Sequence, residues 1–166
     1  ILRAVGGKLY CIGGYRNTNV LLNEVQEYDP VADTWTAKTV MPTAREDFGS
    51  AVLNDKIYCF GGVSPQYGTC FTTMEVYDPV ANTWDETKAD LPVAKWAGDC
   101  GAALGGKIYA VGSASVFTDY PVLHPIYTVY EYDPTGNAWT AKAPLPGGAS
   151  YKEVGADCTY LYVVGG

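Results

Sequence analysis

The clearest candidate for binding chemistry is Trp96, the one tryptophan outside the repeated Tyr–Trp segments. Trp96 precedes the lysine of "KIYAVGS" by eleven residues, and Arg45 precedes that of "KIYCFGG" by eleven, so the two occupy equivalent positions. An aromatic ring beside basic and acidic groups can stack on a sugar or hold a peptide. The alternative is that Trp96 only covers the end of an inner strand. The binding residues we predict are Arg16, Arg45, Glu46, Tyr67, Lys95, Trp96, Tyr120, His124 and Tyr151.

Metal, cofactor and nucleophile chemistry has little support. His124 is the one histidine, and none of the five cysteines forms a C-x-x-C pair, so we expect no metal and no cofactor. No nucleophile elbow or phosphate-binding loop occurs. Cys11 and Cys59 share a position that Ala110 and Val163 fill elsewhere, so we predict both as small buried hydrophobes. Whether the protein is an enzyme stays open, with a non-catalytic role favoured.

The charge balance excludes several partners. The net charge is −7 and there are only three arginines, which argues against nucleic acid and against an anionic membrane surface. No apolar run reaches the roughly 18 residues of a membrane span. The compartment stays open: abundant Tyr, Thr and Gly favour the cell surface or exterior, whereas unpaired cysteines favour the cytoplasm. The chain begins with Ile1, so a leader could have been removed.

Three segments recur in fixed order about every fifty residues. The first comprises "KLYCIGG", "KIYCFGG", "KIYAVGS" and "YLYVVGG", beginning at Lys8, Lys56, Lys107 and Tyr160. The second is "YDPVADTW", "YDPVANTW" and "YDPTGNAW", and the third is "MPTAR", "LPVAK" and "LPGGA". Such spacing indicates a repeated structural unit.

Each unit has the pattern of four β-strands. The heptapeptide is apolar on both alternating faces, which is typical of a strand covered on both sides, and its glycines permit positive φ and close backbone approach. Segments such as "FGSAVL" or "GAAL" suit a crowded inner strand, "NEVQEY" a third strand and "TWTAKT" an outer strand after a "DPVADT" turn. Four strands and this period predict a β-propeller blade. We expect Trp35, Trp84 and Trp139 to pack between blades rather than stack on sugars.

The double glycine, the Tyr–Trp segment and the following Pro, often with Arg, resemble the kelch repeat over essentially the whole chain. Two features depart from it: Ser113 replaces a glycine, and the third repeat carries the longer loop "SASVFTDYPVLHP". The fold class is therefore expected to be an all-β, kelch-type β-propeller of four-stranded antiparallel blades, an incomplete ring of about three and a half blades. The expected single segment is 1–166, with blades at 1–39, 47–87 and 97–142 and a partial blade at 151–166.

The resemblance implies a ring of six or seven blades, about 300–350 residues at this period. An open ring leaves unpaired strand edges. We therefore expect further propeller blades, in the same or another chain.

Function in a propeller is expected on its loops. With strands named a to d outward, the b–c and d–a loops share one face, and the a–b turns, such as "GGK" and "NDK", are short. The predicted function is a non-catalytic binding module that presents the b–c and d–a loops to a protein or glycan. One alternative is a carbohydrate-active enzyme, a sugar mutarotase or a galactose-oxidase-like enzyme, with catalytic residues on other blades. One histidine cannot supply the copper ligands that the oxidase resemblance implies. The other alternative is a structural repeat module of a surface or filament protein.

Overall fold

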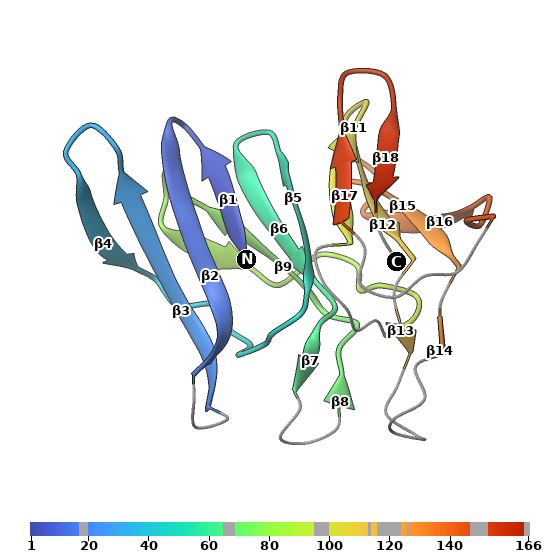
Figure 1. Ribbon diagram of the computed structural model, residues 1–166, viewed down its shortest axis with the longest axis horizontal. Helices are drawn as coiled ribbons and strands as arrows, with labels where there is room; N and C mark the ends of the chain where they lie inside the picture. The colour runs from blue at the N-terminus through green and yellow to red at the C-terminus, as the bar shows by residue number, and fades with distance from the viewer. Residues whose placement is uncertain are drawn as a thin grey trace.

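The computed structural model consists of β-strands and turns in the residues that it describes, which are 1–16, 20–64, 69–94, 100–112, 114–115, 124–125, 127–146 and 153–164. Three four-stranded antiparallel sheets and one two-stranded sheet lie side by side in an arc (Figure 1). We call them blades 1 to 3 and half-blade 4. This arrangement confirms the predicted all-β fold of four-stranded antiparallel blades.

Each blade follows the chain from the inner to the outer strand. Blade 1 contains β1 (Leu2–Val5), β2 (Lys8–Arg16), β3 (Val20–Asp29) and β4 (Thr34–Lys38). Blade 2 contains β5 (Gly49–Leu53), β6 (Lys56–Phe60), β9 (Met74–Asp78) and β10 (Thr83–Asp85). Blade 3 contains β11 (Gly101–Leu104), β12 (Lys107–Val111), β15 (Val129–Asp133) and β16 (Ala138–Lys142), and half-blade 4 contains β17 (Glu153–Ala156) and β18 (Leu161–Val164).

Short hairpins extend the second and third strands beyond the body of each blade. In blade 1, β2 and β3 continue past a bulge between Ile12 and Gly14. In blades 2 and 3 the extensions are the separate pairs β7 (Val63–Ser64) with β8 (Thr69–Cys70) and β13 (Ala114–Ser115) with β14 (His124–Pro125). These hairpins lie at the lower end of Figure 1, which we call the loop face, and the short a–b turns lie at the opposite end, the turn face.

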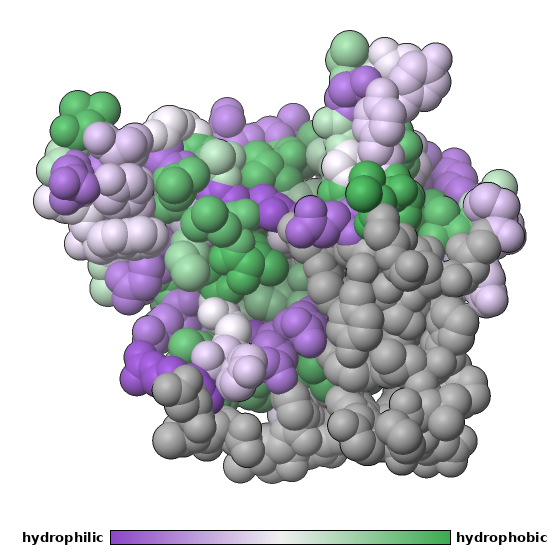
Figure 2. Space-filling view, in the orientation of Figure 1, coloured by the Kyte–Doolittle hydropathy of each residue, from purple (hydrophilic) through white to green (hydrophobic). Residues whose placement is uncertain are grey.

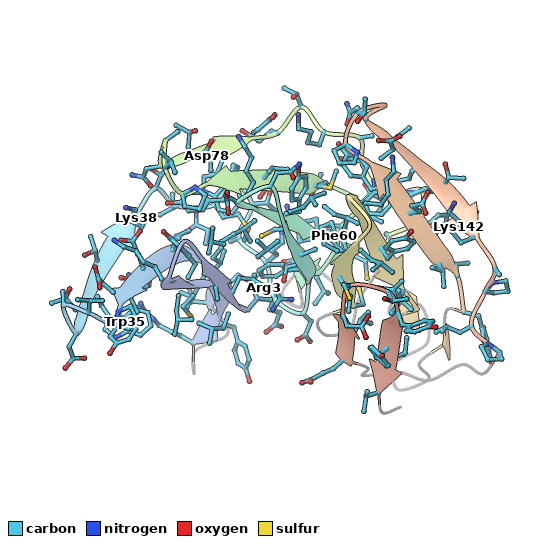
Figure 3. All side chains as sticks on the ribbon, turned by 90° about the horizontal axis from the view of Figure 1, so that it is seen from above. Arg3, Trp35, Lys38, Phe60, Asp78 and Lys142 are labelled. Carbon is cyan, nitrogen blue, oxygen red and sulfur yellow. The ribbon has the colours of Figure 1, made fainter. Side chains whose placement is uncertain are left out.

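The inner strands β1, β5, β11 and β17 follow one another along the inside of the arc (Figure 3). Figure 2 shows hydrophobic residues gathered over β1, β2 and β5. The approach of β11 to β5 requires a glycine, because a Cβ on Gly101 would lie 2.5 Å from the Ser50 carbonyl oxygen. Arg3 of β1 donates to the same carbonyl oxygen at 3.1 Å, so blades 1 and 2 are also linked here. The predicted crowding of small residues in the inner strands is confirmed.

The repeated heptapeptide forms the second strand of each blade, as predicted. In β6 four of the five residues are buried, because blades 1 and 3 cover its two faces. Cys59 is accordingly buried. The prediction for Cys11 is wrong: its thiol is exposed, because no described residue covers that face of blade 1.

Trp84 and Trp139 pack between blades, as predicted, whereas Trp35 does not do so among the described residues. The Trp84 indole donates to the Thr39 carbonyl oxygen of the preceding blade at 3.0 Å, and Trp139 donates to that of Ala89 at 2.9 Å. Trp35 belongs to the first blade, lies at one end of the arc in Figure 3 and is 57% exposed. The same residue type is thus partly covered wherever a described blade precedes it.

Candidate binding site on the loop face

The double glycines of blades 1 and 2 make room for the segment that connects the two blades. The Gly14 amide donates to the Arg45 carbonyl oxygen at 3.0 Å, and the Val63 amide donates to that of Glu46 at 2.9 Å. A Cβ on Gly62 would lie 2.8 Å from the Glu46 carbonyl oxygen, and Gly62 has a φ of +91°, so both space and backbone conformation favour glycine. The connecting segment therefore joins the hairpins of two blades at the loop face.

The Arg45 side chain is fully buried and forms an ion pair with Glu75 at 2.9 Å. It also donates to the Gly61 carbonyl oxygen at 2.8 Å, and to the carbonyl and hydroxyl oxygens of Thr73 at 3.0 and 2.8 Å. Its guanidinium carbon lies 5.3 Å from the centre of the Phe71 ring. Burial lowers the pKa of Arg45, while the charge of Glu75 acts in the opposite direction. Arg45 therefore ties the connecting segment to the ends of β6 and β9.

This location corrects the exposed position that the sequence led us to expect for Arg45. Its distance along the chain from β6 correctly indicated the loop face, but the side chain points into blade 2, where backbone carbonyls and Glu75 bind its two terminal nitrogens. Sequence analysis also missed Glu75. The signal for Glu75 is a carboxylate in the otherwise apolar pattern of "MEVYD", where all residues before the aspartate are buried.

Glu46 remains partly exposed beside the buried arginine. Burial raises the pKa of its carboxyl group, and the neighbouring charge of Asp47 raises it further. No hydrogen bond links the Glu46 carboxylate to another described residue. It is the acidic group of the predicted set that is open to a ligand from this face.

Arg16 lies at the end of the blade 1 hairpin, where its side chain is 64% exposed. It forms an ion pair with Glu24 at 2.9 Å across the two strands. An exposed pair of this kind contributes little to stability, so both charges can be exchanged for contacts with a partner. Arg16, in the hairpin of blade 1, and Glu46, in the connecting segment, thus lie on the same loop face.

Comparison with known proteins identifies the repeat. The KLHDC2/KLHL20/DRC7 Kelch-repeats domain matches residues 1–166. The chain belongs to the kelch-repeat family. It is 27% identical to Kelch-like protein 36 from Bos taurus over 99% of this chain and 26% of the relative. It is also 29% identical to a sulfolyase, N-(sulfonatooxy)prop-2-enimidothioate sulfolyase from Thlaspi arvense, over 76% of this chain and 36% of the relative.

The fold is shared with the solved structure of YjhT, at a TM-score of 0.73 and 18% identity over 93% of this chain and 54% of that one. The kelch chain thus spans about a quarter to a third of the curated relatives named above. These comparisons establish the family and the fold, and the activity of the whole protein is a matter for proposal.

The remaining predicted residues of this kelch chain are only partly placed. His124 is in β14, where it pairs with Ser115. The other five predicted residues lie outside the described residues: Tyr67, Lys95, Trp96, Tyr120 and Tyr151.

The described residues show neither a metal-binding cluster nor a membrane-spanning helix. They contain no group of three or more side chains suited to holding a metal ion. Within the same ranges no helix is long and apolar enough to cross a membrane.

Proposed function

We propose that this kelch chain is a non-catalytic binding module that presents the b–c and d–a loops of its loop face to a protein partner. The observation that carries the proposal is the hydrogen-bonded connection between the hairpins of blades 1 and 2. A loop face with a fixed base loses less conformational entropy on binding than a set of independent loops. The opposite end of the blades has only short turns.

The chemistry proposed for this face combines charged and aromatic groups. Arg16 and Glu46 supply opposite charges that are open to solvent. Trp96 and Tyr67 are the aromatic groups that we propose to complete the surface, together with Lys95, Tyr120, His124 and Tyr151. Tryptophan, tyrosine and arginine are the residue types that most often dominate binding energy at protein interfaces. A glycan partner would use the same aromatic residues for stacking.

We also propose that further blades, in the same or another chain, cover the outer face of blade 1. The support is the contrast between Trp35, which is 57% exposed, and Trp84, which binds the preceding blade. A blade placed against β4 would supply the carbonyl acceptor that the Trp35 indole lacks among the described residues. The binding surface of the whole protein would then include loops from those blades.

A binding screen against peptide and glycan arrays tests the proposed function. Once a ligand is found, Trp96→Ala should weaken its binding by about 30-fold or more, as expected for an interface centre. Arg16→Ala and Glu46→Gln should each weaken it less. Val31→Ser and Val80→Ser are matched controls, because both valines are almost fully exposed on the turn face. Binding that is lost in these controls but kept in the loop-face variants would refute the proposal. Binding to the glycan array but not to the peptide array would show that the partner is a glycan and not a protein.

A second candidate function is enzymatic, because one matched relative is named as a sulfolyase. Glu46, whose carboxyl group has a raised pKa, is the group on this face best suited to acid–base chemistry. A sugar mutarotase is one of the enzymes expected from the sequence. Proton NMR of a reducing sugar in the presence of the complete protein tests this candidate by measuring how fast the two anomers of the sugar interconvert. A catalysed rate that falls at least 100-fold in Glu46→Gln would favour the enzyme, and no acceleration would exclude the mutarotase.

A further inference from the structure

Blade 1 has a polar cluster at its turn face, centred on a carboxylate between β2 and β4. The Tyr10 hydroxyl donates to Glu27 at 2.7 Å. Lys8 and Lys38 form ion pairs with the same carboxylate at 2.8 and 3.2 Å. Tyr10 and Glu27 are opposite each other in the strand register. The buried tyrosine hydroxyl is therefore satisfied by a glutamate of the neighbouring strand.

Blade 3 repeats this arrangement at the equivalent positions. Tyr109 is opposite Glu131 and donates to it at 2.6 Å. Lys142 of the outer strand binds the same carboxylate at 2.9 Å. In both blades the tyrosine at this position thus donates to a carboxylate of the neighbouring strand.

Blade 2 departs from the pattern at two linked positions. Val76 takes the place of the glutamate opposite Tyr58. A carboxylate appears instead on the outer strand, where Asp85 is opposite Val76 and blades 1 and 3 have threonine. Lys88, which binds Asp85 at 2.9 Å, follows the blade tryptophan by one residue more than the corresponding lysines do. The carboxylate and its lysine have thus moved outward, away from the tyrosine.

The change leaves a cavity of about 190 Å³ on the side of blade 2 that faces blade 3. Figure 3 looks down on the turn face and labels Asp78, one of the lining residues, at the outer rim of the blade. The Tyr58 hydroxyl makes no hydrogen bond with any described residue, unlike its two counterparts. The cavity is lined by Tyr58 and Val76 and by the ion pairs Lys56–Asp78 and Lys88–Asp85.

The charges of the lining select the class of ligand. Lys56 and Lys88 balance Asp78 and Asp85, and hydrogen bonds from Thr87 and Lys88 hold the pKa of Asp85 at about 2, so both pairs are ionised at neutral pH. The lining therefore carries no net charge and offers a charged ligand no net electrostatic attraction. The donors that remain available are the Tyr58 hydroxyl and further N–H groups of the lysines, and these can donate hydrogen bonds to the oxygen atoms of an uncharged ligand.

The volume sets the size of the ligand. At about 30 Å³ per molecule the cavity holds roughly six waters, so it is large enough for a small solute. It is smaller than the roughly 300 Å³ at which drug-sized pockets begin, so most of an oligosaccharide or a peptide would lie outside it. We propose that this cavity binds one small uncharged polyhydroxyl molecule, a monosaccharide or a polyol. The site is on the turn face and is separate from the proposed partner surface.

Titration of the ¹⁵N-labelled protein tests the site, with glucose, galactose, N-acetylglucosamine and glycerol as neutral probes and acetate as the anionic probe. We expect at least one neutral probe to shift the amide signals of residues 56–58, 76–78 and 83–88. Val76→Glu places a carboxylate where blades 1 and 3 have one, so it should reduce binding more than tenfold. Tyr58→Phe should weaken binding about 2- to 12-fold, the effect of one neutral hydrogen bond. The control Val80→Ser, at an exposed turn of the same blade, should bind as the parent does.

Three results would overturn the proposal. The first is the absence of localised shifts with every neutral probe at 50 mM, which would mean that only water fills the cavity. The second is acetate binding more tightly than the neutral probes, which would make the cavity an anion site. The third is unchanged binding in Val76→Glu, with thermal unfolding confirming that the variant is folded. If Val76→Glu does not fold, unchanged binding in Tyr58→Phe overturns the proposal in its place.

Discussion

Replacing Arg45 by methionine tests whether the buried arginine supports the fold or belongs to the binding surface. The substitution keeps a long side chain but leaves Glu75, which is 3% exposed, without its ion-pair partner. It also removes the three hydrogen bonds to Gly61 and Thr73. Removal of one partner from a buried ion pair typically costs about 3–5 kcal/mol. For a domain of this size that corresponds to a melting temperature lower by about 6–20 °C.

Urea titration followed by far-ultraviolet circular dichroism measures the change in the free energy of unfolding. The matched control is Arg16→Met, which breaks the exposed pair with Glu24 and should cost less than about 1 kcal/mol. The double variant Arg45→Met/Glu75→Met should recover much of the loss, because no unpaired charge then stays buried. A cost below about 1 kcal/mol for Arg45→Met, or a double variant as unstable as the single one, would refute this role of the ion pair.

Three further predictions concern stability and reactivity. Burial alone would raise the pKa of Glu27, but hydrogen bonds from two lysines and a tyrosine lower it from 4.5 to about 2. The stabilising effect of Glu27 is therefore present above pH 4.5 and is lost as the pH falls through about 2. Acid unfolding of Glu27→Gln should accordingly be less steep than that of the parent. Asn82→Ala should lower the free energy of unfolding, measured by urea titration, by about 2–3 kcal/mol. Asn82 has a φ of +55°, and its side chain accepts hydrogen bonds from a tyrosine hydroxyl and from a backbone amide of blade 1. Asp33→Ala, which removes only the tyrosine contact, should cost less, and equal costs would show that the bond between blades contributes nothing. Burial raises the pKa of Cys59 to about 12, so a thiol reagent should modify the exposed Cys11 quickly and Cys59 only on unfolding. Rapid modification of both cysteines in the folded protein would contradict the buried position of Cys59.

Much of the fold could be predicted because its signals are local. Each blade repeats the same alternation, the same turn residues and the same double glycine within about fifty residues, and strand order follows from short connections. The position of Trp84 between blades also followed from its repeat. The candidate site was harder to predict, because the repeat indicates a residue's strand or loop but not the direction of its side chain.

Arg45 and Cys11 show this limit in opposite ways: Arg45 was expected to be exposed and is buried, and Cys11 was expected to be buried and is exposed. Arg45 is a charged residue near a loop, which usually indicates exposure, yet Glu75, far away in sequence, makes its burial favourable. Cys11 has the same repeat position as the buried Cys59, yet it is exposed because its face of the blade has no described neighbour. In both cases the deciding partner, present or absent, belongs to a different part of the fold.

The sequence by itself determined the repeat, the four-stranded blade and the kelch family, because alternation, glycine conformation and turn chemistry act between residues close along the chain. Only the tertiary structure decided which groups are satisfied inside the blades. Val76 alone is an ordinary strand residue, and it becomes informative when its register opposite Tyr58 shows a hydroxyl without the acceptor that Tyr10 and Tyr109 have. Hydrogen bonding and burial depend on distances between strands, and these distances exist only once the sheets have formed.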